Sequence, residues 1–423
     1  MFYILVSIFL ILLLFGTPIF IAIIIPSLIS FFTTFQNLNE TLAIQRLIGG
    51  IDTFSLLAIP FFMFAAAIMS EGRIGGRLVS FVNSLVGHLP GGLALATVVT
   101  CTLFGAISGT GPAAIVAVGT ILLPALLKEG YSEKLALGTI VSSSTLSMLI
   151  PPGVAMILYG VISGTSIGKV FISGISVGLL TSAFFMLFIF IYAKKYNLPR
   201  SKRATFKEVL HSFIQAFWAL GFPVVILGGI YLGIVTPTEA AAIAVAYVII
   251  VELLIYRSLK PLDIYRIAAS SGRVIAMIFI LIAAGSLLSW LLTVAQIPQM
   301  LVSLLDGMNP ILILLLINVI FLIAGMFLDP NSSIIILTPL VYPVAMSIGV
   351  DPVHLGILIV MNASIGMITP PFGLNIFVAT GTFKVPYERV VPGLVPFIFI
   401  SIITLLLVTF IPEIALWLPN LMP

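Results

Sequence analysis

The sequence predicts an all-α polytopic membrane protein with two inverted repeats, each containing a re-entrant helical hairpin and a broken transmembrane helix. Three observations lead to this prediction. Of the 423 residues, 61% are hydrophobic and 8% are charged, whereas soluble domains carry about 25% charged residues. Pro, Gly and hydroxyl residues interrupt the apolar stretches at the depth where a plain membrane helix would continue. This pattern of interruptions occurs twice.

The composition limits the classes of function. With a mean hydropathy of +1.30 and about 20 residues per crossing, the chain has room for about a dozen membrane segments and none for a soluble catalytic domain. Cys101 is the single cysteine, which excludes an internal disulfide and a thiolate metal cluster. The net charge of +4 comes from basic residues in loops, which indicates topology signals and not a nucleic-acid surface.

An ungapped offset relates the two repeats. Pro124 pairs with Pro343 (343 − 124 = 219). The same offset gives these further pairs: Gly130 with Gly349, Pro151-Pro152 with Pro370-Pro371, and Gly174 with Gly393. A paired Pro-Pro in one register with matching Pro and Gly on both sides indicates an internal duplication.

The first half, residues 1–193, contains repeat 1. Its apolar span 2–32 is expected to begin with a retained first crossing, because residues 1–15 lack the basic region and cleavage site of a signal peptide. Residues 88–127 form two apolar arms joined by the uncharged segment 107–112. Since each arm is shorter than a crossing, the two predict a re-entrant hairpin. Residues 135–162 then predict a crossing that breaks at 142–144 and 151–153.

The second half, residues 211–423, contains repeat 2 and follows a strongly basic loop at 194–210, which we place in the cytoplasm. Crossings are expected at 217–234, 240–256 and 274–293, and again at 391–410. Between them, residues 310–345 predict the second hairpin, with its tip at 328–332, and residues 353–382 predict the second broken helix.

Loop charges predict that the repeats are inverted. The loop 128–134 carries two Lys, whereas its counterpart around Gly349 has neither Lys nor Arg, so the two loops are expected to face opposite sides. When the first hairpin enters from the cytoplasm and the second from outside, only Arg46 and Lys169 of the 18 Lys and Arg fall outside the cytoplasm.

The breaks bring chemistry to the membrane interior. A broken helix frees carbonyl oxygens for a hard cation and N–H groups for a carboxylate, an arrangement typical of secondary transporters. The candidate oxygen donors in repeat 1 are Ser108, Thr110, Ser142, Ser143, Ser144 and Thr145. Those in repeat 2 are Asp329, Asn331, Ser332, Ser333, Asn362, Ser364 and Thr369.

Each candidate also has a purely structural interpretation. Asp329 is the acidic residue predicted deepest in the membrane, which indicates a functional site, but it is also placed to cap the helix that follows it. Asn362 is suited to ligand binding or to helix packing, and hydroxyl groups in membrane helices often bond to their own backbone. The doubled prolines are consistent with a break or with a simple kink.

Several enzymatic and ATP-dependent functions lack their motifs. The segment 164–169 reads Gly-Thr-Ser-Ile-Gly-Lys, one residue short of a P-loop and without its Ser or Thr. His88, His211 and His354 form no His-Glu-x-x-His pattern, and no Gly-x-Ser-x-Gly elbow occurs. We therefore expect no enzymatic activity.

The chain resembles the large membrane subunit (DctM or SiaM type) of TRAP transporters, the tripartite ATP-independent periplasmic transporters. The resemblance covers essentially the whole chain. Its most specific parts are Ile150 to Gly153 with Ile157 to Gly160, Leu328 to Pro339, and Gly366 to Asn375. One departure is Pro330, where many relatives have Met after the Asp.

The resemblance implies an elevator-type, sodium-coupled importer of an organic acid anion, of the sialic acid or C4-dicarboxylate class. It implies two or more Na⁺ ions, one between the first hairpin tip and the first break and another between Gly325, Asp329 and the second break. The metal-ligating residues expected from it are Ser108, Gly109, Thr110, Ser143, Ser144, Gly325, Asp329, Asn362, Gly366 and Thr369. The expected substrate-binding residues are Thr145, Pro152, Ser332, Pro371 and Asn375.

The resemblance also implies partners: a small four-helix membrane subunit, a periplasmic substrate-binding protein and the lipid bilayer of the bacterial inner membrane, with no nucleic acid. The competing hypothesis is a self-sufficient ion-coupled carboxylate carrier of the same architecture, which would need no binding protein. A passive channel differs from both because a sodium gradient would not drive its uptake.

Overall fold

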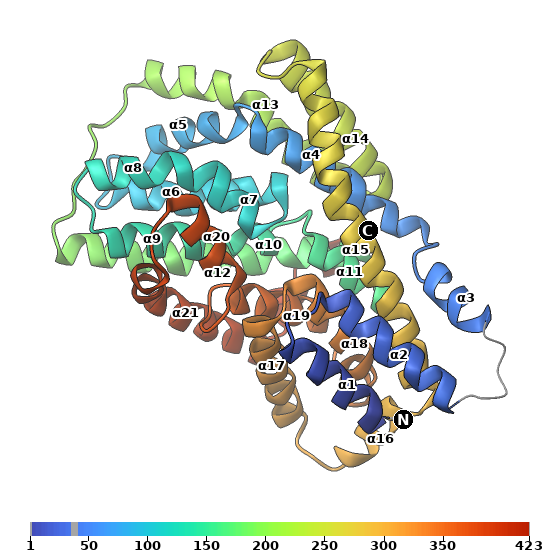
Figure 1. Ribbon diagram of the computed structural model, residues 1–423. Helices are drawn as coiled ribbons and strands as arrows, with labels where there is room; N and C mark the ends of the chain where they lie inside the picture. Colours follow the sequence, from blue (N-terminus) through green and yellow to red (C-terminus); the bar gives the residue numbers. More distant parts are fainter. Residues whose placement is uncertain (1, 35–40, 423) are drawn as a thin grey trace.

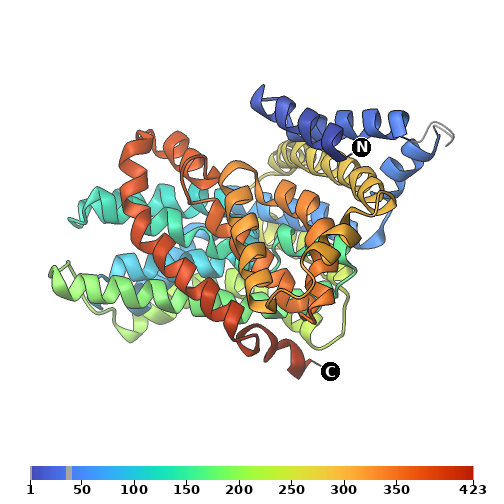
Figure 2. The same cartoon turned by 90° about the horizontal axis from the view of Figure 1, so that it is seen from below.

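The computed structural model describes residues 2–34 and 41–422, and every regular element in these ranges is helical. Nine helical segments of the described chain are long and apolar enough to cross a membrane. The prediction of an all-α polytopic membrane protein is therefore confirmed. Figures 1 and 2 show the helices packed into one body, with α15 running along one side of it.

The first half has these helices: α1 (Phe2–Leu14), α2 (Ile19–Thr34), α3 (Thr41–Gly49), α4 (Ala58–Glu71), α5 (Ile74–Val86), α6 (Gly92–Ser108), α7 (Gly111–Ala114), α8 (Thr120–Lys128), α9 (Glu133–Ser143), α10 (Leu146–Leu149), α11 (Val154–Ser163) and α12 (Ile167–Lys195). The second half has α13 (Phe206–Tyr231), α14 (Pro237–Ile250), α15 (Pro261–Val294), α16 (Ile297–Leu304), α17 (Pro310–Phe327), α18 (Pro330–Ser347), α19 (Pro352–Gly366), α20 (Leu374–Phe383), α21 (Tyr387–Phe410) and α22 (Glu413–Leu416).

Both halves contain a helical hairpin followed by a broken helix. The first hairpin consists of α6 and the continuous stretch from α7 to α8, and the second consists of α17 and α18. Under the offset of 219 residues their ends agree within one residue. Each broken helix is interrupted at its doubled proline, and the Pro151-Pro152 and Pro370-Pro371 peptides are both cis.

The two broken helices run antiparallel. Tyr159, near the end of the first, donates its hydroxyl hydrogen to the carbonyl oxygen of Pro352 at the start of the second, at 2.6 Å. At the opposite end, Glu133 is the first residue of the first broken helix, and Arg389 follows the end of the second broken helix. Oε2 of Glu133 lies 3.7 Å from a guanidinium nitrogen of Arg389. Because the start of each broken helix lies beside the end of the other, the repeats are related by inversion.

The N-terminal region differs from the expected single crossing within 2–32. It forms two helices, α1 and α2, that lie side by side (Figures 1 and 2). The chain turns between them at Gly16, whose φ of +69° is accessible to glycine, and Pro18 follows two residues later. At 13 and 16 residues, neither helix reaches the length of an upright crossing.

Two helical boundaries also differ from the sequence prediction. Helix α15 has 34 residues and begins at Pro261, 13 residues before the predicted crossing at 274, so Arg266 and Arg273 lie on the helix and not in a link. At 1.5 Å per residue it is about 50 Å long, which exceeds a membrane core of about 30 Å. The segment between α12 and α13 is shorter than the predicted loop 194–210.

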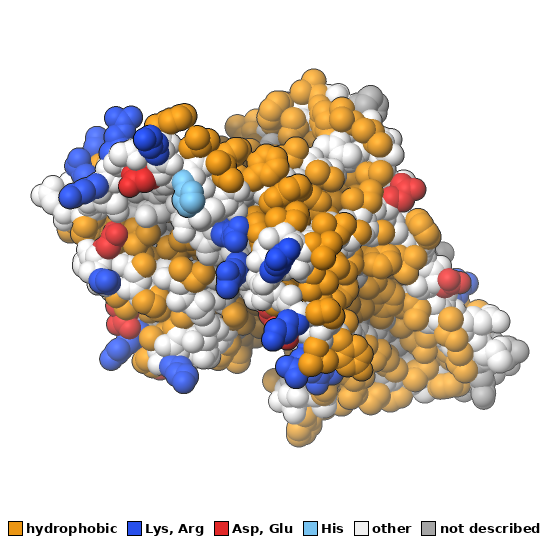
Figure 3. Space-filling model, turned by 90° about the horizontal axis from the view of Figure 1, so that it is seen from above, with side chains coloured by type: hydrophobic (Ala, Val, Ile, Leu, Met, Phe, Trp, Pro, Cys, Tyr) orange, Lys and Arg blue, Asp and Glu red, His pale blue; other side chains and the backbone are white. Residues whose placement is uncertain are grey.

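The surface agrees with a membrane protein. Hydrophobic side chains cover a broad part of the face in Figure 3, whereas Lys and Arg gather at its left and centre. Exposed apolar residues lie along α13, α15 and α17, including Val224, Met277 and Leu312. Such surfaces are stable only against lipid or another apolar partner.

Candidate functional site

A cavity of about 280 Å³ lies where the two hairpin tips meet, and we call it the central cavity. The first tip contributes Gly109 to Pro112, and the second contributes Asp329 to Asn331. Residues beside both helix breaks complete it, together with Met63 of α4 and with Val274 and Ile278 of α15. The inverted repeats thus converge on one cavity.

The first tip turns at Gly109. Its φ of +60° places it in the left-handed region, and an added Cβ would collide with the carbonyl oxygen of Pro152 at the first break. Thr110 follows as the N-cap of α7, but its side chain makes no capping bond. The hydroxyl of Ser108 donates to the carbonyl oxygen of Thr110 at 3.4 Å. The predicted residues of this tip therefore lie together against the first break.

The second tip is organised by Asp329, which occupies the position equivalent to Thr110. Its Oδ2 accepts hydrogen bonds from the backbone N–H groups of Asn331 at 3.0 Å and Ser332 at 3.2 Å. The Ser332 hydroxyl also bonds to Oδ1. Asp329 thus caps α18, as one sequence interpretation proposed, and it also lines the central cavity. The cap leaves acceptor capacity on the carboxylate for a ligand.

Asn375 connects the two repeats. Its Nδ2 donates to Oγ of Ser144 at 2.8 Å, and Ser144 in turn donates to the carbonyl oxygen of Val141 at 2.6 Å. Asn375 is fully buried, and its Oδ1 has no hydrogen-bond partner. The amide lies beside Gly111, where an added Cβ would be 2.5 Å from Nδ2. Asn375 of repeat 2 therefore joins the first hairpin tip to the first broken helix.

A directed chain of hydrogen bonds fixes the orientation of Asn362. Thr409 donates its hydroxyl hydrogen to the carbonyl oxygen of Leu405 at 2.7 Å, so its oxygen accepts from Nδ2 of Asn318 at 2.9 Å. Asn318 must then present Oδ1 to Nδ2 of Asn362, at 2.8 Å. The second hydrogen on that Nδ2 goes to the carbonyl oxygen of Leu358. Both amide hydrogens of Asn362 are used, and its Oδ1 is left as an acceptor.

Buried oxygens without a partner mark both broken helices. In α9, α19 and α20 they are Oγ1 of Thr139, Oγ of Ser142 and of Ser143, and Oδ1 of Asn362 and of Asn375. Ser143 and Asn362 are equivalent positions of the two repeats under the 219-residue offset. An unsatisfied buried polar group costs about 1 to 3 kcal/mol, and this cost recurs at equivalent positions of the two repeats. Hard cations prefer such oxygen donors.

Other predicted residues make backbone or internal contacts. Gly325 and Gly366 lie at the crossing of α17 and α19, where a Cβ on Gly366 would be 2.5 Å from the Gly325 backbone. Thr145 donates to the carbonyl oxygen of Ser142, and Thr369 donates to that of Ile365. Pro152 is buried at the first break, whereas Pro371 is exposed and lies outside the central cavity. The two breaks thus differ in exposure.

Sequence reasoning missed the apolar lining and one polar residue. Met63, Val274 and Ile278 come from helices outside the repeats. They are ordinary apolar residues of a membrane helix, so their types did not indicate a binding site. Asn318 could have been found, because it is the only polar side chain in α17. A lone amide in an apolar membrane arm is a functional or packing signal in its own right.

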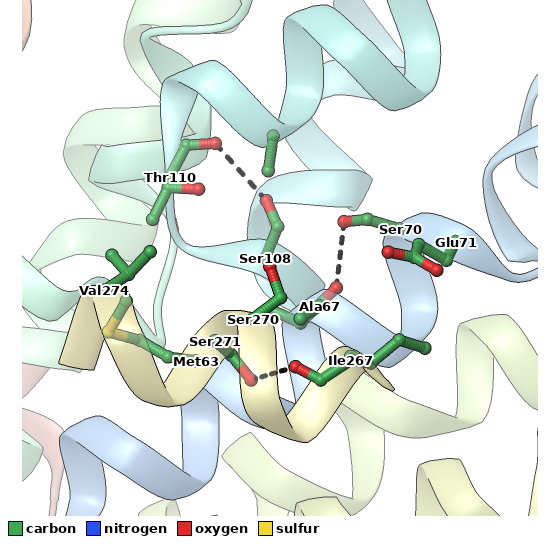
Figure 4. A pocket seen from close by; sticks show the side chains of 12 residues that line it. Met63, Ala67, Ser70, Glu71, Ser108, Thr110, Ile267, Ser270, Ser271 and Val274 are labelled. Carbon is green, nitrogen blue, oxygen red and sulfur yellow. Dashed lines mark hydrogen bonds between the residues drawn. The ribbon is translucent and has the colours of Figure 1, made fainter. Parts of the chain in front are cut away.

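A second cavity, of about 210 Å³, adjoins the central cavity, with which it shares Met63, Thr110 and Val274. Figure 4 shows the Ser108 hydroxyl of the first tip pointing toward the carbonyl oxygen of Thr110, while Ser70 and Glu71 lie at the end of α4. The second cavity continues along α15 past Ser270 and Ser271. The first tip is therefore flanked by a second cavity whose lining includes the carboxylate of Glu71 and several hydroxyl groups.

Comparison with known proteins gives consistent matches. Residues 6–414 match the family described as "Tripartite ATP-independent periplasmic transporter, DctM component". The chain is 46% identical over 415 residues to the ectoine TRAP transporter large permease protein TeaC of Halomonas elongata, covering 97% of each chain. It is 41% identical over 371 residues to the C4-dicarboxylate TRAP transporter large permease protein DctM of Pseudomonas aeruginosa, covering 87% of each.

A solved structure shares the fold. The YdaH transporter of Alcanivorax borkumensis aligns with a TM-score of 0.57 at 16% identity, covering 90% of this chain and 88% of that one. At this level of identity the likeness concerns the fold alone.

Proposed function

This chain belongs to the DctM component family of the tripartite ATP-independent periplasmic transporters, and from that membership we propose that it imports a small organic carboxylate together with sodium ions. It is a multi-pass transporter permease and not an enzyme. The observation that carries the proposal is the central cavity, where hairpin tips and helix breaks of both inverted repeats meet. One site built from both repeats suits a substrate that must be reached from either side.

The sodium part of the proposal rests on the unpartnered buried oxygens. Asn375 Oδ1 and Ser143 Oγ belong to the surroundings of the first tip, and Asn362 Oδ1 belongs to the second broken helix. We place one ion near each break, held by these oxygens and by backbone carbonyls freed there. Asp329 supplies the negative charge at the second tip. No titratable carboxylate stands at the equivalent position, Thr110, so the two ion sites would differ in charge.

We further propose an elevator mechanism. The hairpins and broken helices pack around the central cavity, and α4 and α15 close it from outside the repeats. Movement of the hairpin unit along α4 and α15 would carry the cavity across the membrane. The cavity beside Glu71 and the surface of α15 supply a path for such a movement. This part of the proposal needs only rigid-body motion of a packed unit.

For the substrate we favour ectoine, followed by a C4-dicarboxylate. These are the compounds in the names of the two relatives described above. Ectoine is a compact zwitterion with one carboxylate, and a cavity of about 280 Å³ is of the size expected for a small ligand. Neither of those two relatives is named for sialic acid, so the sialic acid class stays a prediction from the sequence.

The partners proposed are a small membrane subunit and a periplasmic binding protein, with the complex in the bacterial inner membrane. Their support is the tripartite description of the family. A binding protein would deliver the anion to the side of the membrane opposite the basic loops, as the positive-inside rule orients the chain.

Reconstitution tests the proposal. The chain and its small subunit are placed in proteoliposomes, and uptake of radiolabelled ectoine, succinate and sialic acid is measured with and without the binding protein. We expect uptake of one compound only when both the binding protein and an inward sodium gradient are present. Uptake without the binding protein would instead favour a self-sufficient carrier, and uptake indifferent to sodium would favour a channel.

A further inference from the structure

A third cavity, of about 370 Å³, lies at the other end of α15, and we call it the Arg46 cavity. Among the described residues that line it, Arg46 of α3 is the only charged one. Ser286 and Ser289 contribute hydroxyl groups from α15, and Thr53 contributes one from the segment after α3. The hydroxyl of Thr293, which also lines the cavity, donates to the carbonyl oxygen of Ser289 at 2.8 Å. A lone cation among hydroxyl donors is suited to an anion.

Arg46 has a defined position, and among the described residues its charge has no carboxylate partner. Its guanidinium carbon lies 5.4 Å from the centroid of the Trp290 ring, so the side chain is held against α15. Within residues 2–34 and 41–422, no carboxylate lies within 4 Å of it. Stacking on an aromatic face leaves the edge N–H groups of a guanidinium available to a carboxylate in a bidentate geometry.

The Arg46 cavity is one helical turn away from the central cavity on two helices. On α15, Ile278 lines the central cavity and Ile282 lines the Arg46 cavity. On α18, Asn331 lines the first and Ile335 the second. Ile335 packs into the place that Gly285 leaves without a side chain. The apolar side chains of Ile282 and Ile335 therefore line the Arg46 cavity one helical turn beyond the central cavity.

The Arg46 cavity lies toward the end of α15 that is away from the basic loops. Helix α15 begins at Pro261 beside Lys260, carries Arg266 and Arg273 in its first turns, and ends at Val294 near the Arg46 cavity. Under the positive-inside rule, the basic end faces the cytoplasm. The Arg46 cavity is then on the outer side, from which an imported anion arrives.

We propose that the Arg46 cavity is an outer binding site that receives the carboxylate of the substrate before it passes Ile282 and Ile335 to the central cavity. This inference rests on the proposed import of a carboxylate. Arg46 would bind the anion electrostatically, the hydroxyl groups of α15 would orient it, and Gly285 would allow Ile335 to close the passage behind it.

Charge-selective thiol labelling tests the site without any substrate. Ser289→Cys is made in the full chain, where the native Cys101 is fully buried, and the chain is placed in lipid nanodiscs that expose both faces. Its labelling rates are measured with anionic 2-sulfonatoethyl and cationic 2-(trimethylammonium)ethyl methanethiosulfonate. We expect the ratio of the anionic to the cationic labelling rate to fall about tenfold when Arg46→Gln is added to Ser289→Cys. With Arg46→Lys, which keeps the positive charge, the ratio should stay unchanged.

The control is Ser270→Cys at the other end of the same helix, where Arg46→Gln should leave the ratio unchanged and thereby report an intact fold. An unchanged ratio at Ser289→Cys, or no labelling there by either reagent, would overturn the proposed site.

Uptake measurements then show whether the anion that binds in the Arg46 cavity is a substrate carboxylate or a lipid phosphate. In the reconstituted complex, Arg46→Gln should raise KM for ectoine or succinate about tenfold, while kcat stays within about twofold of wild type. The control is Lys169→Gln. Lys169 is the other basic residue assigned to the outer side, and its substitution should change neither KM nor kcat. An unchanged KM with a changed labelling ratio would assign the cavity to lipid and overturn the substrate role. If wild type imports neither compound, the proposed function fails, while the labelling ratio still decides whether the cavity selects anions.

Discussion

Nδ2 of Asn362 lies 2.8 Å from Oδ1 of Asn318, and this contact joins the second broken helix to the first arm of the second hairpin. Because Thr409 holds Asn318 from the other side, the contact orients the Asn362 carbonyl oxygen without touching it. Asn318 thereby decides which atom of Asn362 a ligand would meet.

Asn318→Leu should weaken sodium binding with little effect on the maximal rate. Without its acceptor, the Asn362 amide loses one of its two anchors, and we expect the sodium concentration for half-maximal uptake to rise about tenfold, equivalent to about 1.4 kcal/mol. Sodium-dependent thermal stabilisation of the purified chain gives a second readout.

The control for Asn318→Leu is Thr102→Val in the first hairpin. It removes the buried hydrogen bond that the Thr102 hydroxyl donates to the Ser182 hydroxyl of α12 at 3.1 Å. It should lower stability without moving sodium affinity. An equal sodium shift in both variants would mean that Asn318 acts only through general stability.

Asp329→Asn should separate the capping role from the charge. Asn is as good an N-cap as Asp, so α18 should stay folded, while the loss of the carboxylate should weaken sodium dependence at least tenfold if Asp329 neutralises an ion. The matched variant is Asp351→Asn. Asp351 caps α19 through Val353 N at 2.7 Å and His354 N at 3.2 Å, outside the central cavity. Unchanged sodium dependence in Asp329→Asn would remove it from the ion site.

Asn375→Ala should uncouple the two repeats. The change removes the 2.8 Å bond to Ser144 and the unpartnered Oδ1 near the first tip, and we expect the initial uptake rate to fall about tenfold or more. Thr380→Ala is the control on the same helix, because Thr380 bonds only to the backbone oxygen of Ile376 among the contacts described. Uptake that falls equally in both would contradict a special role for Asn375.

Gly366→Ala should destabilise the crossing of α17 and α19. An added Cβ would lie 2.5 Å from the backbone of Gly325, which cannot move away like a side-chain end, and overpacking of this kind costs about 1 to 3 kcal/mol. Gly381→Ala in α20 meets no atom within 4 Å and should be neutral or slightly stabilising. Thermal unfolding in detergent measures both, and equal midpoints would contradict the close approach.

The hairpins and breaks were predictable because their signals are local. Arm length, the absence of charge at 107–112, and the doubled prolines at 151 and 370 are properties of short stretches. The inverted arrangement followed from loop charges, and the antiparallel contact of Tyr159 with Pro352 confirms it. The cytoplasmic placement of the basic loops stays a prediction.

The remaining features depend on packing between distant segments. Nothing in the sequence near Asn375 indicates that it bonds to Ser144, 231 residues away. The length of α15 was underestimated because its first turns carry Arg266 and Arg273, which read as a loop. The paired helices α1 and α2 were read as one span because both are apolar, and only Gly16 and Pro18 mark the turn.

The most direct test of the central claim is the initial uptake rate of ectoine, succinate and sialic acid as a function of external sodium in proteoliposomes that contain the chain, the small subunit and the binding protein. Two cooperating ion sites should give a sigmoidal dependence on sodium for the transported compound, with no uptake when potassium replaces sodium. Uptake that is equal in potassium and sodium would contradict a sodium-coupled site built from both breaks.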